Sequence, residues 1–117
     1  MSSIASVAYD EELANRIRAQ IADVANLTER RMFGGLAFLV GGNMAVAASG
    51  QGGLLVRVNP DQTDELVSTT SANRMEMRGR EMDGWLRVGA DELRDDSELG
   101  RWVRTGVDYA RSLPAKR

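Results

Sequence analysis

Residues 31–58 read RMFGGLAFLVGGNMAVAASGQGGLLVRV, and this stretch decides the fold. It holds three apolar runs, at residues 32–40, 44–48 and 54–58, which two glycine-rich turns separate. Short apolar runs bounded by turn residues are typical of β-strands. The stretch therefore predicts three antiparallel strands joined as a meander. The pair Gly34-Gly35 lies inside the first run, where it indicates a β-bulge or a close approach of two backbones.

Helical patterns flank this meander on both sides. Asp10 is placed to cap a helix that continues to about Val24, because apolar residues recur every three or four positions behind it. Asn59 and Pro60 interrupt the third strand, and a helix over residues 61–70 is expected behind them. A final helix is predicted to end before Pro114, since the apolar residues from 99 to 113 again follow helical spacing.

A second hairpin is expected between the last two helices. Met75 and Met77 alternate with charged residues, and residues 85–88 resume this period of two after a turn over residues 79–84. The predicted order is helix, three strands, helix, two strands and helix, an α+β domain whose helices pack on a largely antiparallel sheet. We expect one domain over residues 1–117, in which residues 1–8 are flexible and residues 115–117 form a tail.

The composition excludes several classes of chemistry. The 117-residue chain contains neither cysteine nor histidine, so thiolate nucleophiles, imidazole bases and zinc fingers are absent. The net charge of −2 shows no global basic excess of the kind that nonspecific nucleic-acid binding favours. No apolar run reaches the about 18 residues of a membrane span, and the first residues do not resemble a secretory signal. We expect a cytoplasmic, non-enzymatic protein without cofactor or metal.

The second hairpin carries the best surface candidate. Its candidate residues combine guanidinium groups with an indole ring: Arg78, Arg80, Trp85 and Arg87. Such a mixture stacks on a nucleobase or binds an acidic strand of a partner. The alternative is a solvated hairpin, because acidic residues interleave with the arginines and Trp85 can pack inward.

Three weaker candidates lie elsewhere in the chain. Arg31 beside Gly34 and Gly35 suggests a backbone nest for an anion, although a bulge in the first strand is the favoured explanation of the glycines. Arginines on one face of the last helix form a candidate basic stripe, which nearby carboxylates partly neutralise. The stripe consists of Arg94, Arg101, Arg104 and Arg111. The strand methionines, Met75 among them, indicate adaptable packing first and a soft binding surface second.

Several short blocks occur in an order that is hard to obtain by chance. They are residues 8–14 with 16–18, residues 31–38, residues 42–44, and Gly79-Arg80 with Met82 and Gly84-Trp85, followed by a helix that ends in residues 110–114. Together they resemble the N-terminal domain of the TfoX/Sxy family, named for a regulator of bacterial natural competence. The Met-Phe-Gly-Gly block at residues 32–35 is the most diagnostic.

The resemblance implies the same order of elements and supplies no catalytic residues. The chain departs from the family pattern at Glu81, where members often have proline, so we expect the turn of the second hairpin to differ locally from that of other members. Larger competence regulators carry a second, helical domain, and we expect this chain to be a stand-alone single-domain member.

The resulting functional hypothesis is a regulatory or protein-interaction module, in transcriptional control of the competence type. Nucleic-acid binding through the arginines of the second hairpin and the last helix is a less favoured alternative, because the net charge opposes it. A small-ligand pocket between helix and sheet is a third. The partner is expected to be a protein, and the strand around Met75 offers an edge for pairing with a second copy.

Overall fold

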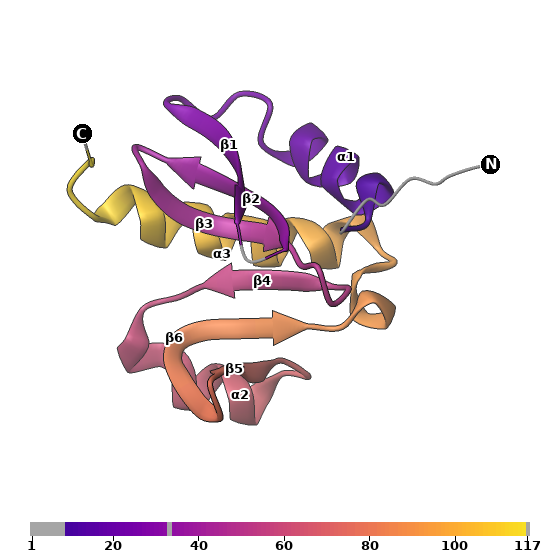
Figure 1. Cartoon of the computed structure of the whole chain (residues 1–117), viewed down its shortest axis with the longest axis vertical. Helices are drawn as coiled ribbons and strands as arrows, with labels where there is room; N and C mark the ends of the chain where they lie inside the picture. The colour runs from indigo at the N-terminus through magenta and orange to yellow at the C-terminus, as the bar shows by residue number, and fades with distance from the viewer. Residues whose placement is uncertain (1–8, 33, 117) are drawn as a thin grey trace.

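Six strands form one antiparallel sheet in the order β1-β2-β3-β4-β6-β5 (Figure 1). Their bounds are Leu27–Met32 (β1), Gly35–Val40 (β2), Asn43–Ala48 (β3), Leu54–Arg57 (β4), Asn73–Met77 (β5) and Arg80–Val88 (β6). The computed structural model describes residues 9–32 and 34–116. Residues 1–8, for which flexibility is expected, Phe33, and Arg117 of the expected tail lie outside the described residues.

The helices form where the sequence patterns predict them; the first two are shorter than expected, and the last begins before the first residue of its apolar pattern. They are α1 (Glu11–Gln20), α2 (Thr63–Thr69) and α3 (Asp96–Ser112). The Asp10 side chain caps α1 by accepting a hydrogen bond from the backbone N–H of Leu13 at 3.1 Å. The α1 helix ends before Val24, and α2 begins after a 3-10 turn over Pro60–Gln62. The α+β class and the antiparallel sheet with packed helices are confirmed.

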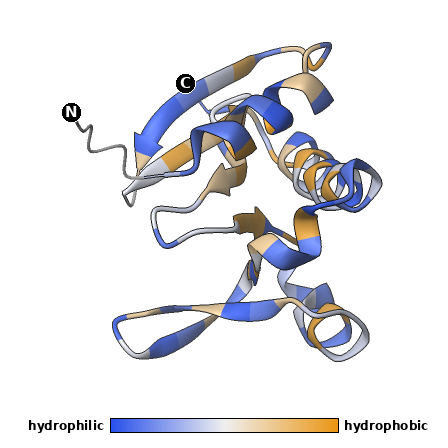
Figure 2. Cartoon of the chain, turned by 90° about the vertical axis from the view of Figure 1, so that its right-hand side faces the viewer, coloured by the Kyte–Doolittle hydropathy of each residue, from blue (hydrophilic) through white to orange (hydrophobic). Residues whose placement is uncertain are grey.

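The expected single strand over residues 32–40 is instead a hairpin, which adds one strand to the predicted order. Gly34 lies in the turn with a φ of +75°, a conformation that favours glycine, and β1 pairs with β2 on its far side. A Cβ atom on Gly35 would overlap the carbonyl oxygen of Ala48, so the expected close backbone approach is present. The β-bulge lies further along β2, between Phe38 and Leu39. Strand β1 escapes detection because it is polar and lies at the sheet edge, as Figure 2 shows.

The second hairpin is tighter than expected. Its turn lies at Arg78-Gly79, and β6 already begins at Arg80, so the expected turn over residues 79–84 is wrong. Instead, β6 bulges between Met82 and Leu86, where Gly84 adopts a φ of +87°. The buried hydroxyl group of Thr63 in α2 accepts a hydrogen bond from the backbone N–H of Gly84 at 2.8 Å. This bond ties α2 to the bulge.

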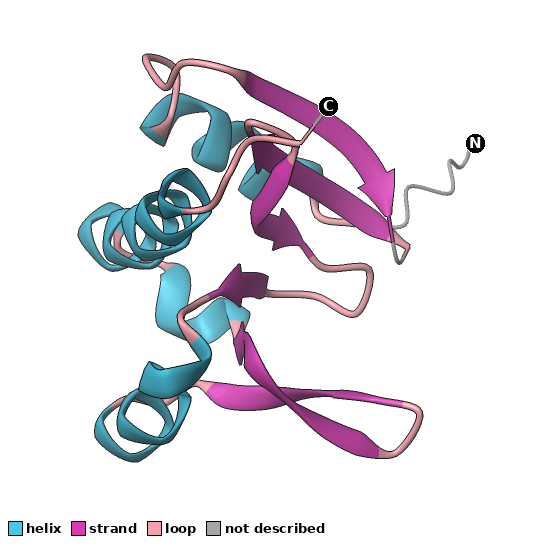
Figure 3. Cartoon of the chain, turned by 90° about the vertical axis from the view of Figure 1, so that its left-hand side faces the viewer, coloured by secondary structure: helices cyan, strands magenta, loops and turns pink. Residues whose placement is uncertain are grey.

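The main core lies between the sheet and the helices. Figure 3 shows that the helices all cover one side of the sheet. This core contains Ile17 of α1, Phe38 and Leu54 of the sheet, and Leu99 of α3, each nearly or completely buried. Trp102 also belongs to it, as its helical spacing predicts. Among the described residues, no helix combines the length and the apolar character that crossing a membrane requires.

Candidate interaction surface

The opposite side of the sheet carries no helix in the described structure, and we call it the helix-free face (Figure 3). A second apolar cluster is buried there, made of Ala37, Leu39, Met44, Ala47 and Leu55. The cluster residues come from β2, β3 and β4, the strands at the centre of the sheet. In the same view, the β1–β2 and β5–β6 hairpins extend away from the helices on either side of these strands.

Three larger apolar side chains pack against this cluster and stay partly exposed. They are Met32 of β1, Met75 of β5 and Trp85 of β6. The central strands are buried on both faces, which explains why their sequence is continuously apolar instead of alternating. The helix-free face therefore has a buried apolar floor, and the sulfur and indole groups at its margins are the side chains of this cluster that remain partly exposed to solvent.

Arginines surround this floor. Residues directly opposite each other in antiparallel strands point to the same face. Four arginines stand opposite residues of the helix-free face: Arg30 opposite Ala37, Arg57 opposite Trp85, Arg80 opposite Met77, and Arg87 opposite Leu55. By the same register, none of the described strand residues on this face is acidic. The face is basic although the whole chain has a net charge of −2.

Two of these arginines are held in place by uncharged partners. The guanidinium carbon of Arg57 lies 5.2 Å from the ring centroid of Trp85 and 5.6 Å from that of Tyr109 in α3, so two aromatic rings flank it. The guanidinium group of Arg87 donates hydrogen bonds to the Ser49 hydroxyl group and the Gly52 carbonyl group, both at 3.3 Å. Both side chains are thus ordered without losing their charge.

No carboxylate neutralises these charges within the described structure. The ion pairs of the described residues involve other arginines, namely Arg16, Arg18, Arg74, Arg94 and Arg101. Arg74, for example, lies in the same hairpin as Arg80, but it points to the helix side of the sheet and pairs there with Asp64 and Asp83. The basic charge of Arg30, Arg80 and Arg87 on the helix-free face is therefore available to an outside partner, whereas the guanidinium group of Arg57 lies near the rings of both Trp85 and Tyr109 of α3.

The structure brings together part of the predicted site. Arg80, Trp85 and Arg87 lie on the helix-free face, and Arg78 occupies the exposed tip of their hairpin with a φ of +56°. Trp85 is half-buried, between the two alternatives that the sequence leaves open. Arg31 stands opposite Leu36, a residue of the main core, so it points to the other side of the sheet.

The predicted nest therefore does not join the hairpin residues. Gly34 and Gly35 build the β1–β2 turn, where Gly35 lies against the backbone at Ala48. Sequence reasoning missed Arg30 and Arg57 as members of the basic face. The signal for Arg57 was its place as the one charged residue in the apolar run LLVRV, but the face to which it points depends on strand register.

The basic stripe on the last helix is largely neutralised. Arg94 precedes α3 and pairs with Asp91 at 3.1 Å, and Arg101 pairs with Glu98 at 2.9 Å. Arg104 and Arg111 remain without an ion pair among the described residues, and both line cavities between α3 and the end of α1.

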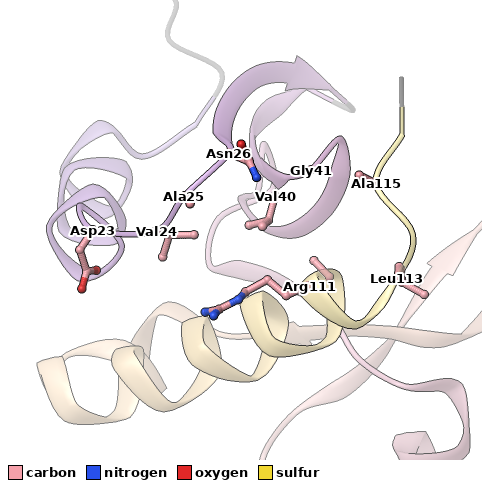
Figure 4. Close-up of a pocket in the computed structure, with 10 residues that line it drawn as sticks. Asp23, Val24, Ala25, Asn26, Val40, Gly41, Arg111, Leu113 and Ala115 are labelled. Carbon is pink, nitrogen blue, oxygen red and sulfur yellow. The ribbon is translucent and has the colours of Figure 1, made fainter.

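The larger of these cavities, with a volume of about 440 Å³, is shown in Figure 4. Arg111 lies on one side of it, and Asp23, Val24 and Asn26 lie on the other. Its charged residues have opposite signs, so it does not present one sign of charge to a ligand. In the described part of the chain, no three carboxylate, imidazole or thiol groups are grouped to hold a metal ion.

Comparison with known proteins places this architecture in a family. No curated protein matches the chain. The family model of the TfoX N-terminal domain matches residues 19–110, which run from the end of α1 through all six strands into the last turns of α3. The match covers more than half of the 117 residues and includes the whole helix-free face. The chain therefore belongs to the TfoX N-terminal domain family.

Proposed function

We propose that this TfoX N-terminal domain is a non-enzymatic regulatory module that recognises a partner protein through its helix-free face. The observation that carries the proposal is the combination of an apolar floor with ordered arginines that have no carboxylate partner in the described structure. Interfaces draw their affinity from a few such aromatic, methionine and arginine anchors. The resemblance to competence regulators supports a regulatory role in transcription, and the first residues, which do not resemble a secretory signal, support a cytoplasmic location.

The absence of a catalytic role is part of the same proposal. The chain has no histidine or cysteine, and no carboxylate is among the buried residues of the described structure. General acid–base chemistry at neutral pH needs a group whose pKa lies near that pH. The lowered carboxyl pKa values, at Glu29 and Asp95, move away from that range.

Capture of partners from the native lysate by the tagged chain, with nuclease treatment, tests the proposal. The informative variant is Arg80→Glu, because Arg80 is exposed and its reversal removes no ion pair of the described structure. The matched control is Arg104→Glu on α3, an identical charge change on the opposite side of the sheet. We expect a nuclease-resistant partner that Arg80→Glu loses and Arg104→Glu keeps. A partner retained by Arg80→Glu would contradict the proposal.

Nucleic-acid binding is the second candidate function. We assign it to the arginines beside Trp85 and not to the α3 stripe, because those arginines have no ion pair among the described residues. Capture that nuclease abolishes, with an affinity that falls steeply as salt rises, would support this candidate instead. If two copies of the chain associate, we propose that they pair through the exposed edge of β5. Light scattering at several concentrations would detect such a dimer.

A further inference from the structure

We infer that the helix-free face binds an extended acidic segment of its partner and that at least one apolar side chain of this segment packs against the partly exposed Met32, Met75 or Trp85. This inference rests on the proposed function, because it names the chemistry of the partner for the same face. Three features of the face support it: the sign of its charge, the residues of its floor and its strand geometry.

The charge of the face selects an acidic partner. Arg30, Arg57, Arg80 and Arg87 share the face, and none of its described strand residues is acidic. A second copy of this chain seated face to face would place like charges together, which is unfavourable. Carboxylates, by contrast, form charge-assisted hydrogen bonds with the planar guanidinium group. A carboxylate-rich segment is thus complementary to this surface.

The floor of the face requires an apolar anchor in that segment. Met32, Met75 and Trp85 are each partly exposed while they pack on a buried cluster. Methionine side chains are unbranched and adapt to varied apolar groups, which suits a binding surface. A purely acidic segment would leave these groups in water, whereas one or two apolar side chains would cover them.

The strands favour an extended conformation of the ligand. Strand β5 is an edge of the sheet; it contains Met75 and pairs with β6, the strand that contains Trp85. An extended segment directs alternate side chains to the same side, so apolar side chains at every second position can reach one floor. Single-stranded nucleic acid fits less well, because Trp85 is the one aromatic residue among the described strand residues of this face, and successive bases need successive stacking partners.

The test is fluorescence anisotropy of labelled peptides titrated with the full chain. The first probe is a peptide of about ten residues, rich in glutamate, with two leucines at alternate central positions. Three comparison probes are the same peptide with glutamine for glutamate, the same peptide with serine for leucine, and a single-stranded oligonucleotide of equal charge. We expect the first probe to bind at least about tenfold more tightly than any of the others.

Two variants locate the binding. Arg80→Glu is expected to weaken binding of the acidic peptide by about tenfold, and Arg104→Glu is expected to leave it unchanged. Arg80 is exposed at the start of β6, so its replacement preserves the fold, which circular dichroism verifies. Equal binding of the glutamine peptide, tighter binding of the oligonucleotide, or loss of binding only in Arg104→Glu would each overturn the inference.

The outcomes also separate the inference from the proposed function. If lysate capture depends on Arg80 but the acidic peptide does not bind, the helix-free face recognises a partner of other chemistry and the inference fails alone. If neither capture nor peptide binding depends on Arg80, both fail.

Discussion

Two glycines of α3 show how closely single residues are fitted in this protein. A Cβ atom on Gly106 would overlap the carbonyl oxygen of Ala45 and lie 2.8 Å from a methyl carbon of Val46. A Cβ atom on Gly100 would lie 3.0 Å from the side-chain oxygen of Gln20, which is the end of a flexible side chain. The first glycine is required because α3 packs directly against the backbone of β3 there, whereas the second faces a group that can move.

The two glycine-to-alanine variants should therefore differ in sign. In a helix, this change usually stabilises by up to about 1 kcal/mol. We expect Gly106→Ala to lower the free energy of unfolding by about 1–3 kcal/mol through overpacking. Gly100→Ala, the matched control, is expected to leave it unchanged or raise it. Urea denaturation followed by circular dichroism measures both, and equal stability of the two variants would contradict this account.

At the scale of elements, an ion pair links the edge strand β1 to α1. Its four central residues are exposed, so burial contributes little to its docking. Arg18 of α1 donates two hydrogen bonds of 2.7 Å to the two carboxylate oxygens of Glu29 in β1. The hydrogen bond from Arg18 holds the pKa of the Glu29 carboxyl group below its usual value of 4.5.

This pKa shift predicts a pH-dependent contribution of Glu29 to stability. Because the folded pKa lies below the unfolded one, the contribution is present above pH 4.5 and is lost as pH falls through the folded pKa. The pair is solvent-exposed, so Glu29→Gln should cost less than about 1 kcal/mol at pH 7. Denaturation of both proteins from pH 7 downward should show this difference disappearing below pH 4.5. A difference that persists in acid would show that Glu29 acts through another interaction.

At the scale of the whole molecule, the residues after α3 close the fold. The backbone N–H of Lys116 donates a hydrogen bond to the Gly41 carbonyl group at 2.7 Å. The buried side chain of Asn43 donates one to the Pro114 carbonyl group at 2.9 Å. The segment over residues 113–116 thus connects the end of α3 to the β2–β3 turn, beside the cavity of Figure 4.

Removing residues 113–117 is expected to lower the free energy of unfolding by about 1–3 kcal/mol, because the buried Asn43 amide loses its acceptor. Asn43→Ala serves as the matched variant, made in both the full and the shortened chain. If the account is right, Asn43→Ala costs less in the shortened chain, and this coupling is measured by a double-mutant cycle in urea. Equal costs in both chains would contradict it.

Some elements of this fold could be predicted from the sequence and others could not, depending on whether local or distant contacts form them. Asp10 and the apolar residues behind it predicted α1, and Trp102 was assigned to the core from helical spacing alone. Both depend on contacts within a few residues of one another. Strand β1 was missed because a polar edge strand carries no apolar pattern. The turn of the second hairpin, which lies at Arg78-Gly79, was predicted too far along the chain because the bulge at Gly84 resembles a turn in sequence.

The candidate surface likewise combines features that the sequence determines with features that depend on the tertiary structure. The sequence alone determined the α+β class, the Asp10 cap of α1, the absence of histidine and cysteine chemistry, and the pairing of arginines with Trp85 in one hairpin, since each depends on composition or local spacing. Only the tertiary structure decided that Arg30 and Arg57 join Arg80 and Arg87 on one face, whose described strand residues include no carboxylate, and that Arg31 does not. Strand register sets that outcome, because a shift of one residue moves every side chain to the opposite face.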